Sequence, residues 1–399
     1  MTDEPAVLTD LDITRPGFFL RPDYYEVLAW LRANQPAFPL PDGSWLISRH
    51  DDIRMISSQP DRFRSRSGVL VNDPMRAVDA GQDHGSLIHL DPPKHAAYRK
   101  LLNRRFTPRA SAGLEPVIRR KTDEAFAGLA AGDEVDFVET IAAPVPVEVI
   151  AELLGIADGD RADFRRWSDA MIVISDNPGD ETLAAAGAEL FAFLDDHIRE
   201  RAREPRDDLI STLLASSVEG AQLTRAEVLM FCMTLLVAGN ETTRTLLAGA
   251  AEVLAQHPDQ RARLADTPDA IPNAVEELLR WVTPIQAFCR TATTASELGG
   301  TAVPEGGYVV LLYASGNRDE AAYGPTAGQF DAFRPAHPAH VAFGFGEHLC
   351  LGAALARLEA RVVLEQLLAR FPDYELLGEP ELLPSTLTRG IQREVVRLA

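Results

Sequence analysis

One cysteine, Cys350, stands at the end of a glycine-rich stretch and at the start of an apolar helical pattern. The stretch reads Phe-Gly-Phe-Gly-Glu-His-Leu-Cys-Leu-Gly over residues 343–352. A thiol at a helix N-terminus feels the positive end of the helix dipole and free backbone N–H groups, which favour its thiolate. Gly344 and Gly346 permit turns that other residues resist, and Gly352 leaves room for a flat ligand near the backbone. A thiolate presented in this way suits the axial ligand of a haem iron.

The alternative is that Cys350 is a small buried apolar residue, which is the commoner role of a lone cysteine. The spacing argues against it, because the order Phe-Gly-x-Gly-x-His-x-Cys-x-Gly resembles the haem-ligand signature of the bacterial cytochrome P450 family. The resemblance covers nearly the whole chain, from Trp45 to Gly390. It implies that Cys350 is the axial ligand of the iron of haem b. The other residues that it implies for the cofactor loop are Phe343, Gly344 and Gly352.

A second group of reactive side chains lies in the sequence Ala-Gly-Asn-Glu-Thr-Thr, which begins at Ala238. Thr242 can bond back to the carbonyl of Ala238 and bend a helix there, while Gly239 lowers the cost of the bend and clears space. A loosened turn with a hydroxyl and a carboxylate can order water and pass protons. Taken alone, Glu241 could equally pair with Arg244 on the surface. The P450 resemblance matches Glu241 and Thr242 to the acid and alcohol that deliver protons to dioxygen at the haem.

Four cations from three segments match the residues with which the family holds the two haem propionates. His95 and Arg99 are four residues apart on a predicted helix that begins after Pro93, so they share one face. Arg290 opens a predicted strand, and His348 lies in the cysteine loop. Each alone is more often a solvated surface group.

Glu277 and Arg280 are spaced as an ion pair on a predicted helix, which many helices carry. Arg334 follows the sequence Phe-Asp-Ala-Phe and matches the family's third partner. The resemblance implies a buried Glu277–Arg280–Arg334 network that holds the loop around Cys350. We interpret these three residues as structural.

A substrate pocket should lie one or two helical turns before Thr242. Its predicted lining is mostly apolar, which indicates a hydrophobic small molecule such as a terpenoid, a steroid or a fatty-acid-like compound. An apolar helix face is, however, more often core than pocket. The family's spacing assigns to the pocket Thr234, Val237, Ala238, Gln286, Ala287 and Thr386, together with the loop at 70–88 and Met171–Ile174.

The elements that must position these groups are mostly helical. A capping box, Thr224-Arg-Ala-Glu227, begins an apolar helix that could run to Gln256 and cross the whole domain. We therefore expect a mostly α fold with minor β, a P450 fold with a long central helix over the haem and small β-sheets. Further helices are predicted at 23–34, 51–57, 93–154 with breaks, 160–203, 270–281 and from 351, and strands at 44–48, 288–292, 308–313 and 395–398.

We expect a single domain over residues 1–399, because no linker, repeat or low-complexity block divides the chain. A β-richer N-terminal part covers about 1–90, and a helical haem-binding body covers about 91–399. The formal net charge of −20 argues against nucleic acid or an anionic membrane surface as the main partner. The N-terminus resembles neither a signal peptide nor an anchor. Three cysteines without zinc or iron–sulfur spacing indicate the cytoplasm.

The chain has no dinucleotide fingerprint, flavin domain or iron–sulfur cysteines, so its electrons must come from separate proteins, a ferredoxin and its reductase. A basic stretch offers either a docking face for an acidic ferredoxin or simply a solvated helix face. The stretch comprises Arg99, Lys100, Arg104, Arg105 and Arg109.

The resulting hypothesis is a haem-thiolate monooxygenase that inserts one atom of dioxygen into a hydrophobic substrate. Two alternatives remain: a peroxide-driven enzyme on the same scaffold, and a haem protein that binds a ligand without turnover. The Glu241–Thr242 pair weighs against both, because neither needs a proton relay.

Overall fold

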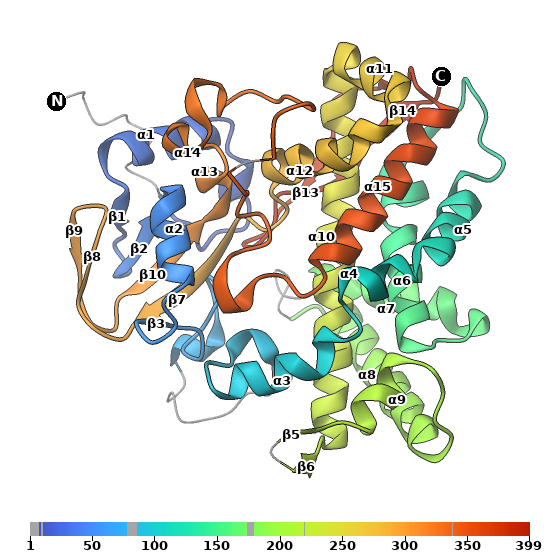
Figure 1. The fold of residues 1–399 in the computed structure, drawn as a ribbon, viewed down its shortest axis with the longest axis horizontal. Coiled ribbons are helices and arrows are strands. Elements are labelled where there is room, and N and C mark those ends of the chain that lie inside the picture. Colours follow the sequence, from blue (N-terminus) through green and yellow to red (C-terminus); the bar gives the residue numbers. More distant parts are fainter. Residues whose placement is uncertain (1–7, 9–10, 78–85, 174–178, 219, 337) are drawn as a thin grey trace.

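A computed structural model describes residues 8, 11–77, 86–173, 179–218, 220–336 and 338–399. Helices make up most of this part of the chain, and the blue N-terminal strands lie with several orange strands on the left of the molecule, while other strands lie at the bottom and at the upper right (Figure 1). The predicted fold class, mostly α with small sheets, is confirmed. None of the described helices, α8 and α10 included, has the apolar length that a bilayer span requires.

The helices and strands follow one another along the chain, with two long connections, from β3 to α3 and from α14 to α15. The helices are α1 Tyr24–Asn34, α2 His50–Ser57, α3 Lys94–Asn103, α4 Pro108–Ala112, α5 Glu115–Phe126, α6 Pro144–Leu154, α7 Arg161–Val173, α8 Glu181–Arg203, α9 Leu209–Leu214, α10 Arg225–Gln256, α11 Pro258–Asp266, α12 Ile271–Val282, α13 Tyr313–Gly316, α14 Glu320–Tyr323 and α15 Ala353–Arg370. The strands are β1 Ala37–Pro39, β2 Ser44–Ile47, β3 Phe63–Arg64, β4 Glu134–Asp136, β5 Ser217–Val218, β6 Ala221–Gln222, β7 Ala287–Ala292, β8 Ser296–Leu298, β9 Thr301–Val303, β10 Tyr308–Leu312, β11 Glu375–Leu376, β12 Glu381–Leu383, β13 Gly390–Arg393 and β14 Val395–Arg397.

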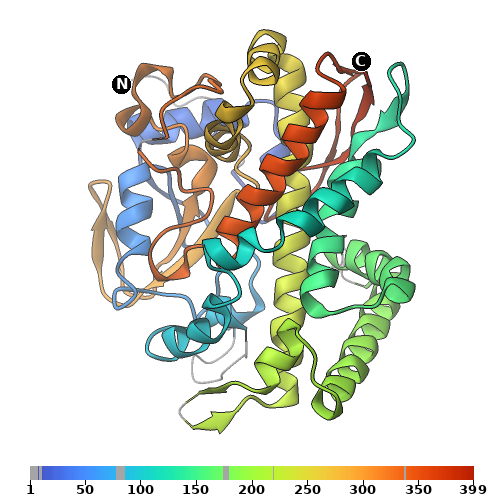
Figure 2. The ribbon, with the colours of Figure 1, turned by 45° about the vertical axis from the view of Figure 1, so that its right-hand side comes forward.

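Helix α10 is the axis of the molecule, and it spans 32 residues as predicted (Figures 1 and 2). Its start is fixed by the predicted capping box. The Thr224 hydroxyl accepts from the Glu227 N–H at 3.2 Å, and the Glu227 carboxylate accepts from the Thr224 N–H at 2.7 Å. Helices α6, α8, α12 and α15 pack against it. Residues 245–251 of this helix are all buried, which accounts for the apolar run from Leu246 to Ala251.

The largest sheet has five strands in the order β1-β2-β10-β7-β3. Strand β7 is antiparallel to β10, with Arg290 opposite Val309. The sheet confirms the strands predicted near residues 44, 288 and 308. It also holds the backbone of Arg290 in place within β7. The predicted strand at the C-terminal end is also confirmed, as β14.

The region from 93 to 154 departs from its predicted helical pattern. It contains the strand β4, which pairs with β14 from the other end of the chain. Three residues of strand carry too little alternation to be recognised locally, and only the distant partner stabilises them.

Glu394 lies between β13 and β14 and is 1% exposed, and neither of its carboxylate oxygens has a hydrogen-bond partner among the described residues. Burial, together with the nearby carboxylates of Glu252 and Asp136, raises its pKa from 4.5 to about 9. The folded chain therefore binds a proton here that the unfolded chain releases. Stability should fall as pH rises from about 4.5 towards about 9.

We expect Glu394→Gln to stabilise the protein by about 2 kcal/mol at pH 7 and much less at pH 5. The reason is that the amide has no proton to lose. Thermal unfolding of both proteins across this pH range measures the difference. Glu381→Gln, on the exposed face of β12, is the matched control and should leave the pH dependence unchanged. Equal pH dependence of Glu394→Gln and the parent would contradict the prediction.

Candidate active site

Cys350 lies in the loop between a one-turn helix at 346–348 and α15. Its N–H donates to the Phe343 carbonyl at 2.9 Å, which closes the glycine-rich turn. Helix α15 begins at Ala353, after Gly352 as N-cap, so the helix starts two residues later than the predicted start at Leu351. The cysteine therefore precedes the helix instead of opening it.

The glycines of this loop have different roles. Gly346 has φ +71°, and a Cβ there would lie 2.1 Å from the Ser57 carbonyl oxygen in α2, so no other residue fits. Gly344 has φ +68° and requires the same backbone freedom. Gly352 has an ordinary φ of −83°, and nothing lies within 4 Å of the position of its Cβ. The open space beside Gly352 fits the predicted room for a flat group.

The Cys350 side chain is exposed, yet it lies deep enough among protein atoms for desolvation to be the largest influence on its pKa. Burial raises that pKa above the usual value, while the Gly352 N–H and the guanidiniums of Arg99 and Arg357 lower it. The Gly352 N–H thus acts in the direction expected of the helix end, although burial leaves the net pKa of the thiol above its usual value. A bound metal ion deprotonates a coordinating thiol outright.

Between its first and last turns, α10 is least covered around its middle. Ala238 is exposed, and Thr234 and Thr242, one turn to either side, are half-buried. The predicted back-bond is present, since the Thr242 hydroxyl donates to the Ala238 carbonyl at 2.6 Å. Thr234 makes the same bond to the Met230 carbonyl at 2.8 Å. Both hydroxyls are thus held against the helix, beside the open face.

Glu241 is 8% exposed and accepts a hydrogen bond of 2.6 Å from the hydroxyl of Thr388. The surface pairing with Arg244 does not occur, because Arg244 lies 3.8 Å from Asp169 instead. Thr388 is fully buried and bridges to Ile285. Sequence reasoning missed Thr388, because this contact joins positions 147 residues apart and no local pattern signals it.

Gly239 serves packing and does not open space beside α10. A Cβ at this position would lie 2.8 Å from Cδ1 of Ile150 in α6. The glycine lets α6 approach α10 closely. The predicted role of Gly239 in clearing space is corrected accordingly.

The four predicted cations come together from α3, β7 and the cysteine loop. His95 and Arg290 are 1% and 5% exposed, and the His95 ring centroid is 4.2 Å from that of His348. The Arg99 guanidinium donates a hydrogen bond to the Leu349 carbonyl. The Ser65 hydroxyl, which sequence reasoning missed, is 3.1 Å from Nε2 of His348.

Burial sets the charge of this cluster. Desolvation lowers the pKa of His95 to about 4 and that of His348 to about 3, and the neighbouring guanidiniums of Arg99 and Arg290 add to both effects. At neutral pH the cluster therefore holds two guanidinium charges and two neutral imidazoles. Nε2 of His95 is buried and has no hydrogen-bond partner among the described residues. Two fixed cations and an unsatisfied imidazole suit a ligand with two carboxylates, as haem has.

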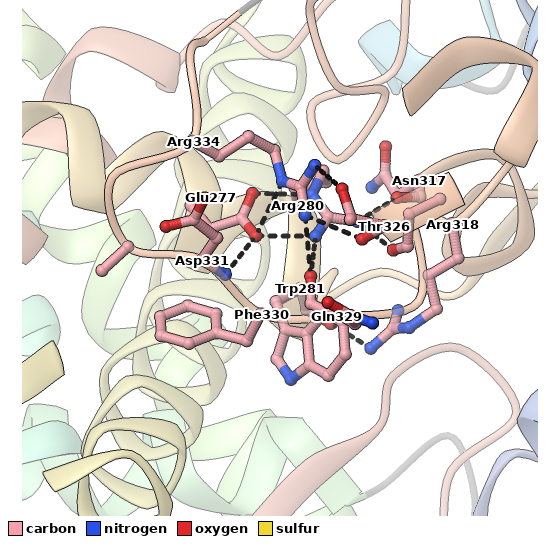
Figure 3. Close-up of polar contacts among 12 residues, drawn as sticks. Glu277, Arg280, Trp281, Asn317, Arg318, Thr326, Gln329, Phe330, Asp331 and Arg334 are labelled. Carbon is pink, nitrogen blue, oxygen red and sulfur yellow. Dashed lines mark hydrogen bonds and ion pairs between the residues drawn. The ribbon is translucent and has the colours of Figure 1, made fainter. Parts of the chain in front are cut away.

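The Glu277 network has the predicted geometry (Figure 3). The carboxylate of Glu277 accepts two bonds of 2.7 Å from Arg280, which is 2% exposed, and one of 3.2 Å from Arg334. Arg280 also donates to the carbonyls of Asn317, Ala327 and Gln329.

Asn317 carries this network towards the cysteine loop, and sequence reasoning missed it. Its amide oxygen accepts from the N–H of Val341 at 2.7 Å, and its amide nitrogen donates to Thr283 at 2.8 Å. Val341 immediately precedes the glycine-rich stretch. The three charged residues thus act on the loop through Asn317.

Two predicted pocket residues do not line open space. Gln286 is fully buried, accepts from the Tyr24 hydroxyl at 3.0 Å and donates to the Thr283 carbonyl at 2.5 Å. Ala287 is 1% exposed in the core beneath the large sheet. Gln286 precedes β7 and Ala287 opens it, and both side chains are covered by protein, so neither lines open space in this structure and their assignment to the pocket is corrected. Thr386 and Val237 are half-buried. Within the predicted loops, 78–85 and residue 174 lie outside the described residues.

The basic stretch divides into two groups. Arg99 faces the cysteine loop, and Arg105 pairs with Asp207 at 2.9 Å. The remaining three cations are exposed and make no ion pair within the described part of the chain. These three, which we call the α3–α4 cations, are Lys100, Arg104 and Arg109.

Comparison with known proteins places the candidate site in a wider context. The Cytochrome P450 family model matches residues 269–382. A steroid C26-monooxygenase of Mycobacterium tuberculosis (strain H37Rv) is 34% identical over 388 residues, 96% of this chain and 94% of that protein. A vitamin D(3) 25-hydroxylase of Pseudonocardia autotrophica is 40% identical over 378 residues, 93% and 92% of the two chains. The solved structure of cytochrome P450 CYP109Q5 from Chondromyces apiculatus matches with a TM-score of 0.86 and 37% identity, over 98% of both chains.

Proposed function

Because this chain belongs to the cytochrome P450 family and is a monooxygenase, we propose that it oxidises a C–H bond of a steroid-like substrate at a haem b held by Cys350. The observation that carries the proposal is an exposed thiol on the same loop as a cluster with an unsatisfied imidazole, the buried guanidinium of Arg290 and the half-buried guanidinium of Arg99. Bound haem would supply the reactive oxidant, and the protein would supply binding and proton control.

The haem would be held by residues of the cysteine loop, α3 and β7. Cys350 would ligate the iron, while His95, Arg99, Arg290 and His348 would bind the two propionates. The open side of Gly352 would accept the edge of the flat ring.

Proton control would rest on α10. Glu241 would hold a proton near the open face, and the Thr242 hydroxyl would pass it to the reacting oxygen through ordered water. Thr388 would orient the Glu241 carboxylate through its 2.6 Å hydrogen bond. A buried acid with a dedicated partner supports dioxygen-driven chemistry over a peroxide-driven reaction, which needs no proton relay.

The absorption spectrum of the reduced protein under carbon monoxide tests the ligand. We expect the strongly red-shifted band of a thiolate-ligated haem. Cys350→Ser should lose this band and the monooxygenase activity, because an alcohol is a far weaker ligand than a thiolate. Cys232→Ser, at a buried cysteine on α10 that has no role in the site, is the matched control and should keep the band. A red-shifted band in Cys350→Ser would contradict the assignment.

The substrate class is proposed from two observations. The relatives described above act on a steroid and on vitamin D(3), both large and apolar. The open face of α10 carries small or apolar side chains, with Ala238 at its centre. Titration with steroids, terpenoids and fatty acids, followed by the haem spin-state shift, ranks the three classes. A response to fatty acids alone would overturn the steroid assignment.

Electrons are proposed to come from a cytoplasmic ferredoxin-type protein that docks on the α3–α4 cations. Reversing all three charges to Glu should slow the first electron transfer at low salt by about tenfold and flatten its salt dependence. Arg105 is left intact, because its pairing with Asp207 is structural. Arg203→Glu, at an exposed position near the end of α8, is the control for a change of charge away from the proposed docking face. Unchanged rates and salt dependence in the triple variant would exclude this docking face.

A further inference from the structure

Glu347 brings a carboxylate into the cluster of cations on the cysteine loop. Its Oε1 lies 3.5 Å from Nε2 of His348 and is buried without a hydrogen-bond partner among the described residues. The other charged or titratable groups that act on it are His95 and Arg99 on α3, Arg290 on β7 and Asp61 before β3. Nothing in the proposed function uses this acid.

A count of charges shows what Glu347 would do beside a bound haem. The guanidiniums of Arg99 and Arg290 are the permanent charges of the cluster, because an arginine side chain stays protonated in proteins. Two propionates would balance Arg99 and Arg290 completely. An ionised Glu347 would be a third carboxylate for the same two cations.

A metal ion does not explain the arrangement. The ligand atoms of His95, Glu347 and His348 lie within 4.8 Å of one another, which a cation could bridge. Arg99 and Arg290 are close enough to lower the pKa of His95, and they would repel a cation in the same way. The positive surroundings therefore favour a carboxylate ligand.

We propose that Glu347 competes with the haem propionates for Arg99 and Arg290, so that it loosens the haem and disfavours reduction of its iron. The proposal rests on the haem site of the proposed function. Negative charge near an iron favours its ferric state, since that state carries the greater positive charge. Glu347 would thus set how much driving force an electron donor must provide.

Removing this charge has a defined effect on the holoprotein. We expect Glu347→Gln to lose ferric haem to excess apomyoglobin about fivefold more slowly than the parent. Its midpoint potential, measured by spectroelectrochemistry, should be higher. Burial raises the pKa of Glu347 above the usual value, so the Glu347 carboxylate of the parent protein becomes protonated and neutral as pH falls. The differences in haem-loss rate and in midpoint potential between Glu347→Gln and the parent should therefore become smaller towards acid pH.

Two matched variants separate charge from shape. Glu347→Asp keeps the charge and should retain most of the parent's low potential. Asp61→Asn removes one exposed negative charge near the cluster and should shift the potential much less. The proposal is overturned by parental haem loss and potential in Glu347→Gln, by faster haem loss in it, or by equal effects of Gln and Asp. The carbon monoxide band of the parent tests the haem-thiolate assignment separately, because Glu347 does not affect which atom ligates the iron.

Discussion

Glu277→Ala should yield protein that retains little haem and unfolds at lower temperature than the parent. The carboxylate of Glu277 accepts bonds from Arg280, from Arg334 and from the Asp331 N–H at 3.0 Å. Its removal leaves the guanidinium of Arg280, which is 2% exposed, without a counter-charge. Breaking a buried pair in this way costs about 3–5 kcal/mol. Because Asn317 links the same network to Val341, the loss should reach the cysteine loop.

The measurements are the ratio of haem to protein after purification and the thermal midpoint of unfolding. Glu152→Ala is the matched control, since Glu152 on α6 also pairs with an arginine, Arg161 at 2.8 Å. Arg161 keeps Glu148 as a second partner at 2.8 Å, so we expect a cost of about 1 kcal/mol and normal haem content. Normal haem content in Glu277→Ala would refute the structural role.

Thr242→Ala should lower product formation by about tenfold or more while consumption of reducing equivalents continues, with hydrogen peroxide as the main product. The expectation follows from the position of the hydroxyl, which lies on the open face of α10 next to the buried Glu241. Without it, protons reach the oxygen by uncontrolled routes, and dioxygen is released as peroxide before it can react with substrate.

Product, peroxide and cofactor consumption should be measured together for each variant. Thr243→Ala is the matched control, because Thr243 is 4% exposed and therefore faces away from the open side of the helix. We expect its ratio of product to reductant to stay near the parental value. A parental ratio in Thr242→Ala, or equal uncoupling in both variants, would remove Thr242 from the relay.

Local patterns were enough to predict the elements with strong periodicity and the motifs within them. The capping box at Thr224 predicted the start of α10, and the spacing of Glu277 and Arg280 predicted an ion pair that the structure contains. Loop glycines were predicted well where the backbone itself demands them, as at Gly346. These features depend on residues within a few turns of one another, so the sequence carries their physical cause directly.

The missed features depend on contacts between distant segments. Thr388 meets Glu241 only because the C-terminal strands pack on α10, and Gly239 is required by Ile150 of α6. Gln286 has an ordinary loop sequence around it, yet its side chain is buried and accepts a hydrogen bond from the Tyr24 hydroxyl. The raised pKa of Cys350 reflects the total burial around it, which no motif encodes.

The cluster of cations has a consequence for the order of events during synthesis. Its members come from positions 95, 99, 290 and 348, and the thiol follows at 350. A chain that leaves the ribosome from its N-terminus exposes α3 and α10 long before Arg290 and the cysteine loop. No part of the nascent chain up to α12 can hold a haem by both its iron and its carboxylates. Cofactor capture must therefore be a late step, and α3 must wait with His95 and Arg99 unpaired until the last third of the protein arrives.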